Sequence, residues 1–237
     1  MRNRGEHSFI NLHRFGVSLY DRMTQSRAIK AQFREIAQDL VSRVSHGRLL
    51  DIGTGPGRLL IEIHKMNSDI ELFGLDVSDS MIEEARKNLT GIKADLRQGN
   101  IRSTSYESDF FDIVTCTGSF YLWEYPEECL EEIFRILKEG QSAYLYETYK
   151  DFDSIDLKKA LRANLKNERL LLRLIALFFL KKQLRMTYKS DEVVDIIEHT
   201  RFAGNYKLDK IILAGLPIWM RIELRKKINC WDDRIGK

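Results

Sequence analysis

Three glycines at alternate positions give the sequence its clearest chemical feature. They lie in LLDIGTGPGRLL, residues 49–60, between an apolar run that predicts a strand and a segment that predicts a helix. Glycine accepts positive φ angles and lets a ligand approach the main chain closely. The start of the helix adds unpaired N–H groups and a partial positive charge. Gly53, Gly55 and Gly57 therefore predict a loop that holds a small-molecule ligand.

An acidic residue ends the next predicted strand. Asp76 follows the apolar run at 70–75 and stands 19 residues after Gly57. In a doubly wound sheet the carboxyl ends of the strands border one crevice, which places this carboxylate beside the glycine loop. There it can accept hydrogen bonds from both hydroxyls of a ribose. NAD would also suit a loop and an acid, but the dinucleotide fingerprint has its third glycine one position later than Gly57.

Strands and helices alternate through the middle of the chain. Apolar runs predict strands at 48–52, 70–75, 92–96, 111–115 and 143–148, and helices are expected at 26–44, 58–66, 80–88 and 126–137. This order is typical of a parallel sheet covered by helices on both faces. A helical stretch at about 153–186, broken once, and a short helix at 191–200 follow. The last two strands, 206–213 and 218–224, are joined by a tight turn and must be antiparallel.

With these features, the sequence resembles the class I S-adenosylmethionine-dependent methyltransferases over nearly its whole length. The matching segments are LLDIGTGPGRLLIEI (49–63), GLDVSDSMIEEARKN (74–88), GNI (99–101), DFFDIVTCTGSFYLWEYP (109–126) and EIFRILKEGQSAYLYE (132–147). The resemblance implies an α/β fold with a doubly wound, seven-stranded, Rossmann-like sheet in the order 3-2-1-4-5-7-6, its last strand antiparallel. It also implies N-terminal helices and a helical cap insertion after strand 5.

The resemblance also implies a division of the chain, which we expect to form one domain over residues 1–237. A helical cover at 1–46 precedes the cofactor-binding core at 47–150, and the cap insertion follows at 151–190. The final helix and hairpin take up 191–225, and a basic tail takes up 226–237.

The family pattern assigns a cofactor site for S-adenosylmethionine, with S-adenosylhomocysteine as the product. The glycines would skirt its amino-acid part, Asp76 would hold the ribose, and the other positions would pack on the adenine or methionine ends. The full set is Tyr20, Asp51, Gly53, Thr54, Gly55, Gly57, Asp76, Val77, Met81, Asn100, Ile101 and Thr117. Many relatives carry an aspartate where Asn100 stands, so the adenine amino group would meet an amide oxygen without a charge.

Aromatic residues after strand 4 and on strand 5 are expected to form the substrate pocket. The candidates are Phe120, Tyr121, Trp123 and Tyr146, with Glu147 and Tyr149 as candidate proton acceptors. The DPPY or NPPY motif that suits methylation of base or glutamine amino groups is absent. Cys116, Cys129 and Cys230 have no metal-ligand spacing, so no metal site is predicted, and Cys116 is expected to be a core residue.

The cap insertion carries most of the charge. Residues 155–189 hold ten Lys or Arg against two acids, about +8, in a chain with a net charge of +3. We expect a lid over a small-molecule acceptor. A membrane-surface helix for a lipid or quinone, a nucleic-acid contact, methylation of a protein and a merely solvated face remain alternatives. The apolar stripe of the cap runs through Leu157, Leu161, Leu165, Leu172, Ile175 and Phe179.

Composition sets the remaining expectations. The 237 residues are 43% hydrophobic and 31% charged, which is ordinary for a globular protein. The N-terminal segment lacks the apolar stretch of a secretion signal, and the apolar run at 170–180 is interrupted by Arg173 and is short for a membrane span. A cytoplasmic enzyme is expected. A non-catalytic cofactor-binding or interaction module is the alternative of another class, and an NAD-dependent oxidoreductase is less favoured because no SxxxYK-like pattern is present.

Overall fold

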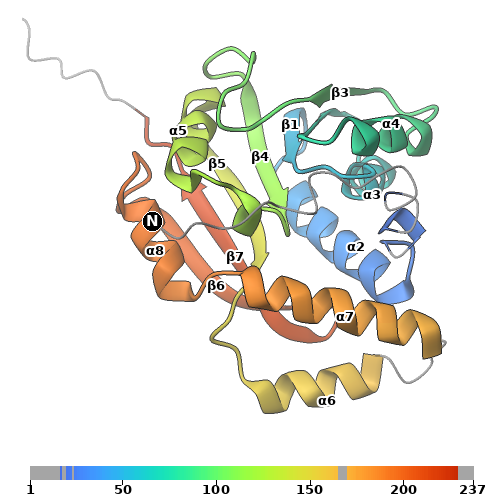
Figure 1. Cartoon of the computed structure of the whole chain (residues 1–237). Helices are drawn as coiled ribbons and strands as arrows, with labels where there is room; N and C mark the ends of the chain where they lie inside the picture. The colour runs from blue at the N-terminus through green and yellow to red at the C-terminus, as the bar shows by residue number, and fades with distance from the viewer. Residues whose placement is uncertain (1–16, 18–19, 23, 165–169, 229–237) are drawn as a thin grey trace, which may run out of the picture.

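A seven-stranded sheet in the order β3-β2-β1-β4-β5-β7-β6 forms the middle of the molecule (Figure 1). The computed structural model describes residues 17, 20–22, 24–164 and 170–228. The predicted strand order is confirmed. β1 to β5 run parallel, and β7 runs antiparallel to both of its neighbours, β5 and β6. Residues 1–16, 18–19 and 23 of the expected N-terminal cover at 1–46, most of the basic tail and Cys230 lie outside the described residues.

The elements agree closely with the predicted ranges. The strands are β1 Gly47–Ile52, β2 Ile70–Asp76, β3 Ala94–Gln98, β4 Phe111–Thr117, β5 Leu137–Thr148, β6 Tyr206–Leu213 and β7 Leu216–Arg225. The helices are α2 Arg27–Val41, α3 Arg58–Met66, α4 Asp79–Asn88, α5 Pro126–Ile136, α6 Ser154–Asn164, α7 Leu170–Met186 and α8 Ser190–Glu198, with a short 3₁₀ turn η1 at Phe120–Leu122. In the part of the chain that the structure describes, no helix combines the length and apolarity needed to cross a bilayer.

Helices cover both faces of the sheet and divide the core in two. Successive residues of β1 point to opposite faces, so Leu49 belongs to the part of the core covered by α2 and α3, and Leu50 belongs to the part covered by α5 and α8. Both leucines are fully buried. Near-continuous apolar strands such as β1 and β4 are what a parallel sheet with two covered faces requires.

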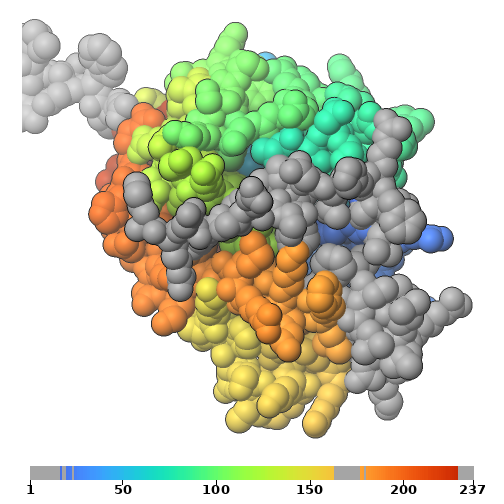
Figure 2. Space-filling view, viewed as in Figure 1, coloured from blue at the N-terminus to red at the C-terminus, as the bar shows by residue number. Residues whose placement is uncertain are grey.

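The cap consists of α6 and α7, which lie together at one end of the molecule (Figures 1 and 2). Of the predicted apolar stripe, Leu157 is buried in the core beside β7, and Leu161 is partly buried against the same core. Leu165 and the side chains of Leu172, Ile175 and Phe179 lie outside the described residues. The two described residues of the stripe therefore face the protein.

Two of the differences from the predicted boundaries have a clear structural cause. β5 begins at Leu137, six residues before the predicted start, because the chain leaves α5 already extended and Leu137 pairs with Phe111. The final hairpin turns over two residues, Ala214 and Gly215, where a four-residue Ala-Gly-Leu-Pro turn was expected. Both residues have positive φ angles, 48° and 73°, which matches the twist of a tight hairpin.

Ala214 is a strained position in this turn, and we predict that Ala214→Gly stabilises the fold. A left-handed backbone costs a non-glycine residue about 1–2 kcal/mol, partly offset by the extra entropy that glycine gives the unfolded chain. The free energy of unfolding should rise by about 0.5–1 kcal/mol in urea titrations. Gly215→Ala should lower it by a similar amount. An unchanged or lowered midpoint for Ala214→Gly would contradict the assigned turn.

Candidate functional site

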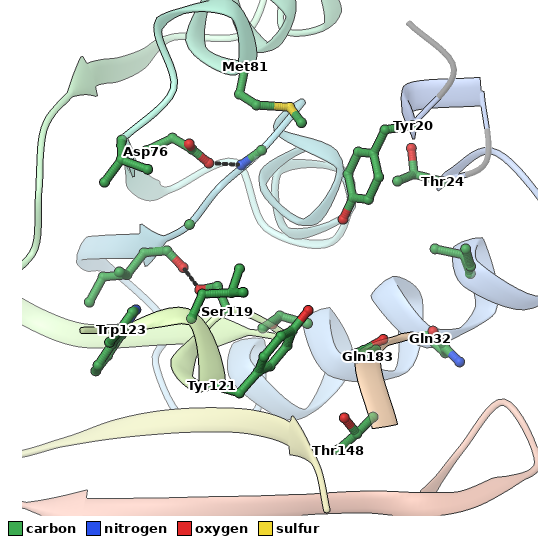
Figure 3. Close-up of a pocket in the computed structure, with 18 of the residues that line it drawn as sticks. Tyr20, Thr24, Gln32, Asp76, Met81, Ser119, Tyr121, Trp123, Thr148 and Gln183 are labelled. Carbon is green, nitrogen blue, oxygen red and sulfur yellow. Dashed lines mark hydrogen bonds between the residues drawn. The ribbon is translucent and has the colours of Figure 1, made fainter. Parts of the chain in front are cut away.

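A cavity of about 430 Å³ opens at the carboxyl ends of β1, β2 and β4 (Figure 3). Its walls come from the glycine loop after β1, the turn after β2, the loop after β4, helix α2 and the cap. This is the crevice where doubly wound sheets bind their ligands. Of the residues that the sequence singled out, the cavity is lined by Tyr20, Gly53, Gly55, Asp76, Val77, Met81, Asn100, Ile101, Thr117, Tyr121 and Trp123.

The glycine loop folds back across the end of β2. The N–H groups of Gly53 and Thr54 both donate to the Leu75 carbonyl oxygen, at 2.8 and 3.1 Å. Gly53 has a φ of 69°, and a Cβ there would lie 2.3 Å from Ser119 Oγ. Gly55 has a φ of 51°, and a Cβ there would face only the Tyr20 ring, at 3.9 Å. The first glycine is therefore needed for packing, and the second keeps the floor of the cavity open.

Asp76 fastens this loop to the turn after β2. Its Oδ2 accepts from the Gly55 N–H at 2.8 Å, and its Oδ1 accepts from the Ser78 N–H at 2.9 Å. Burial raises the pKa of Asp76, while the two N–H donors act in the opposite direction. A carboxylate has about four acceptor positions. Two of the acceptor positions of Asp76 therefore remain for the hydroxyl groups of a ligand in the cavity.

An apolar slot lies beside Asp76. Val77 is 39% exposed and lines the cavity. Met81 and Ile101 line the cavity with it. Asn100 Oδ1 accepts from the Arg102 N–H at 2.9 Å, which fixes the turn after β3. The Asn100 oxygen, which is expected to meet an adenine, thus already accepts one hydrogen bond. A ligand would use its second lone pair.

An ion pair anchors the N-terminal segment over the glycine loop. Arg58, the residue directly after the third glycine, donates to both carboxylate oxygens of Asp21 at 2.7 Å. Asn88 donates to the same carboxylate at 3.2 Å. This places the neighbouring Tyr20 at the cavity opposite Asp76 (Figure 3). Burial, and then the charge of Asp76, raise the pKa of the Tyr20 hydroxyl to about 12, so it stays a hydrogen-bond donor.

Three members of the predicted cofactor set support the loop without lining the cavity. Asp51 is buried near the end of β1, Thr54 is buried within the loop, and Gly57 caps the start of α3 with a φ of 75°. A Cβ on Gly57 would lie 2.6 Å from the side chain of Leu89, the residue directly after α4, so this glycine allows α3 and α4 to approach. Burial raises the pKa of Asp51 to about 7, and the charge of Asp76 adds to the shift.

The predicted aromatic pocket divides into two groups. Tyr121 and Trp123 line the cavity, whereas Phe120 is 1% exposed and packs in the core between Trp123 and Tyr188. The Tyr146 hydroxyl points away toward α2 and donates to Asp39 Oδ2 at 2.5 Å.

Tyr149 does not reach the cavity lining either. Its ring packs against Phe152, with Lys210 Nζ 4.8 Å from its centre.

Glu147 lies under the loop that follows β4. It is 1% exposed, and its Oε1 accepts from the N–H groups of Ser119 and Phe120, each at 2.8 Å. Its Oε2 has no hydrogen-bond partner among the described residues. Burial raises the pKa of Glu147 to about 8 against the effect of those donors. The carboxylate shapes the wall of the cavity from behind and does not line it.

The structure adds a part of the site that the sequence did not predict, here called the distal chamber. It extends the cavity beyond Gly118, between α2, the cap and the start of β7. Its lining comprises Ala28, Ile29, Gln32, Phe33, Ile36, Thr148, Leu161, Leu177, Leu180, Gln183, Leu216, Ile218 and Trp219. None of these described lining residues is charged. The helix at 26–44 and the cap were both predicted, but only the packing of the cap against α2 forms this cavity wall.

Comparison with known proteins assigns the family. Residues 43–201, more than half of the chain, match the family model described as "Methyltransferase domain". The chain belongs to this methyltransferase family. The resemblance seen in the sequence is thereby confirmed, and the sheet order is the class I one.

The relatives of this methyltransferase are distant. It is 30% identical to the uncharacterised methyltransferase YdaC of Bacillus subtilis over 95 residues, 40% of this chain and 52% of YdaC. It is 31% identical to demethylmenaquinone methyltransferase of Lactiplantibacillus plantarum over 157 residues, 62% of this chain and 65% of that protein. The matches thus span roughly half to two thirds of these proteins.

A solved structure shows the same fold over almost the whole chain. It is that of a presumed S-adenosylmethionine-dependent methyltransferase from Methanococcus maripaludis, 22% identical, with a TM-score of 0.71. The match covers 95% of this chain and 97% of that one. The cap and final hairpin of the methyltransferase therefore belong to a shared architecture.

The buried Glu147 predicts a pH-dependent stability for this methyltransferase. Its pKa of about 8 in the folded state exceeds the usual 4.5, so the folded chain holds a proton that the unfolded chain loses. The contribution of Glu147 to the free energy of unfolding should be fully present below pH 4.5. It should be lost between pH 4.5 and 8, by at most ~1.4 kcal/mol per pH unit. Glu147→Gln should flatten this slope in urea unfolding at pH 5, 7 and 9. Parallel slopes in the two proteins would refute the assignment.

Proposed function

We propose that this methyltransferase moves a methyl group from S-adenosylmethionine to a small, uncharged and largely apolar acceptor. The observation that carries the proposal is the distal chamber. It adjoins the glycine loop through Gly118, and its described lining is apolar or neutral throughout. A small-molecule site of this kind is mainly apolar with a few polar groups that fix orientation.

The residues present fit the methyl donor. Asp76 retains two acceptor positions for ribose hydroxyls, and the exposed Val77 with Met81 offers an apolar slot for a flat base. Gly55 leaves the space above the loop open. Tyr20, held by the Asp21–Arg58 pair, lies across from Asp76 and would cover the donor.

The chain's own contribution is alignment and exclusion of water. When bound, S-adenosylmethionine supplies a methyl group already activated by positively charged sulfur. Tyr20, Tyr121 and the cap enclose the space next to Gly118, where the two reactants would meet. Holding two reacting groups in line can contribute ~7–11 kcal/mol in favourable cases.

A general base within the chamber is not part of this proposal. No carboxylate, histidine or lysine occurs in the described lining of the distal chamber. Glu147 holds the N–H groups of Ser119 and Phe120 from behind, and Tyr149 packs outside the cavity. We therefore infer that positioning carries the catalysis: the nucleophilic atom of the acceptor takes the methyl group, the methyl–sulfur bond breaks to leave S-adenosylhomocysteine, and the proton that the acceptor loses passes to solvent.

Hydroquinones are the acceptor class that best fits both the neutral chamber and the relatives of this methyltransferase. One relative acts on demethylmenaquinone and another on 2-methyl-6-phytyl-1,4-hydroquinone, judging from their names. An aromatic ring with hydroxyl groups would suit the neutral chamber. The exposed basic residues of the cap, such as Lys158, Lys159 and Lys181, do not line the cavity. A membrane surface or an RNA would thus meet a different face from the one that holds the acceptor.

Loss of the Asp76 carboxylate should weaken binding of the methyl donor. Hydrogen bonds to a charged group contribute ~1.5–3 kcal/mol, so Asp76→Asn should lower the affinity for S-adenosylhomocysteine roughly 10- to 150-fold in calorimetry. Asn keeps one acceptor oxygen for the loop. Asp79→Ala, an exposed acid at the start of α4, is the matched control and should bind normally. Equal affinities in both variants would contradict the placement of the ribose.

Transfer of labelled methyl groups tests the acceptor class. With labelled S-adenosylmethionine we expect product from a neutral, apolar hydroquinone such as 1,4-naphthoquinol. We expect none from total RNA or from a protein mixture, because the acceptor would have to fit between α2 and the cap, which both line the distal chamber. Labelling of RNA or protein, with none of the quinol, would contradict the small-molecule assignment.

A further inference from the structure

Two glutamines face the distal chamber with unused hydrogen-bonding groups. Gln32 comes from α2 and Gln183 from α7, and both line the cavity (Figure 3). Neither side-chain amide has a hydrogen bond within the described part of the chain, although most of the surrounding lining is apolar. Each amide can both donate and accept. Such groups in a mainly apolar cavity are the kind that orient a ligand.

Gln183 lies at the junction between the chamber and the cofactor side. Its Nε2 would be 3.6 Å from a Cβ built on Gly118, the residue that follows β4. The Gly118 N–H donates to the Tyr146 carbonyl oxygen at 2.9 Å, so this part of the wall is fixed by the sheet. Gln183 comes from the cap and Gly118 comes from the end of the sheet. The side-chain amide of Gln183 therefore lies where the cap meets the cofactor side of the cavity.

Two further polar groups of the chamber are unmatched. Thr148 of β5 and Trp219 of β7 are directly opposite each other in the antiparallel pair, and both line the cavity. Thr148 Oγ1 and Trp219 Nε1 are buried and have no hydrogen-bond partner among the described residues. Buried polar groups are nearly always paired in folded proteins. The chamber therefore has more hydrogen-bonding capacity than the chain itself uses.

We propose that Gln183, together with Gln32, binds a neutral oxygen or nitrogen group of the acceptor and so selects uncharged acceptors that carry one. This inference rests on the proposed function and refines it. An amide donates to a carbonyl or hydroxyl oxygen and accepts from a hydroxyl or N–H group, but it does not neutralise a charge. A carboxylate or ammonium on the acceptor would stay unpaired, because the described lining of the chamber has no charged side chain. Burying an unpaired charge is strongly unfavourable.

Three probes with one ring system separate these effects: naphthalene, 2-naphthol and 2-naphthoate. Their dissociation constants would be measured by fluorescence at pH 7, on the full chain saturated with S-adenosylhomocysteine. The wild-type protein should bind 2-naphthol more tightly than 2-naphthoate. Gln183→Leu should lower the preference for 2-naphthol over naphthalene about 2- to 10-fold, the range of one neutral hydrogen bond. Gln32→Leu should lower it in the same direction.

Gln38→Leu is the control, because Gln38 lies on the exposed side of the same helix α2. It should keep the wild-type preference, and all three variants should bind S-adenosylhomocysteine normally. An unchanged preference in Gln183→Leu, tighter binding of 2-naphthoate than 2-naphthol, or no binding of any probe would overturn the inference. Failure of the wild-type protein to bind S-adenosylhomocysteine would instead overturn the proposed function, so the two outcomes are distinguishable.

Discussion

The rest of the site depends on the two hydrogen bonds that Asp76 accepts from the main chain. They join the loop after β1 to the turn after β2, at the carboxyl edge of two neighbouring parallel strands. With the loop fixed, α3 begins directly after Gly57, and its first residue, Arg58, can reach Asp21 and hold the N-terminal segment over the cavity. The same carboxylate keeps two lone pairs for a ligand. One half-buried acid thus organises the loop and faces the site that the loop borders.

Much of this arrangement could be predicted from the sequence because local patterns determine it. The apolar runs and the glycines between them predicted β1, α3 and β2 almost to the residue, and the close spacing of β6 and β7 predicted their antiparallel pairing. Gly53, Gly55 and Asp76 line the cavity, as expected from their places at strand ends, and Val77 and Met81 line it at positions that the family resemblance assigned. In each case the position along the chain decides where the side chain goes.

The remaining residues depend on packing between distant segments. Tyr146 and Glu147 are neighbours on β5, yet strand alternation sends the tyrosine to Asp39 of α2 and the glutamate under the loop after β4. Sequence alone marked both as pocket candidates because it does not fix which face meets the cavity. Gln32 and Gln183 carry no motif at all. They converge only because α7 lies across the end of the sheet, where it meets α2 around the distal chamber.

The central claim is that the glycine loop and Asp76 form a site for S-adenosylmethionine. Calorimetric titration of the purified chain with S-adenosylmethionine, S-adenosylhomocysteine and NADH tests it most directly. The account predicts micromolar binding of the two adenosyl ligands and none of NADH, since the loop lacks the third glycine spacing of dinucleotide sites. Binding of NADH alone, or of no ligand by the folded protein, would contradict it.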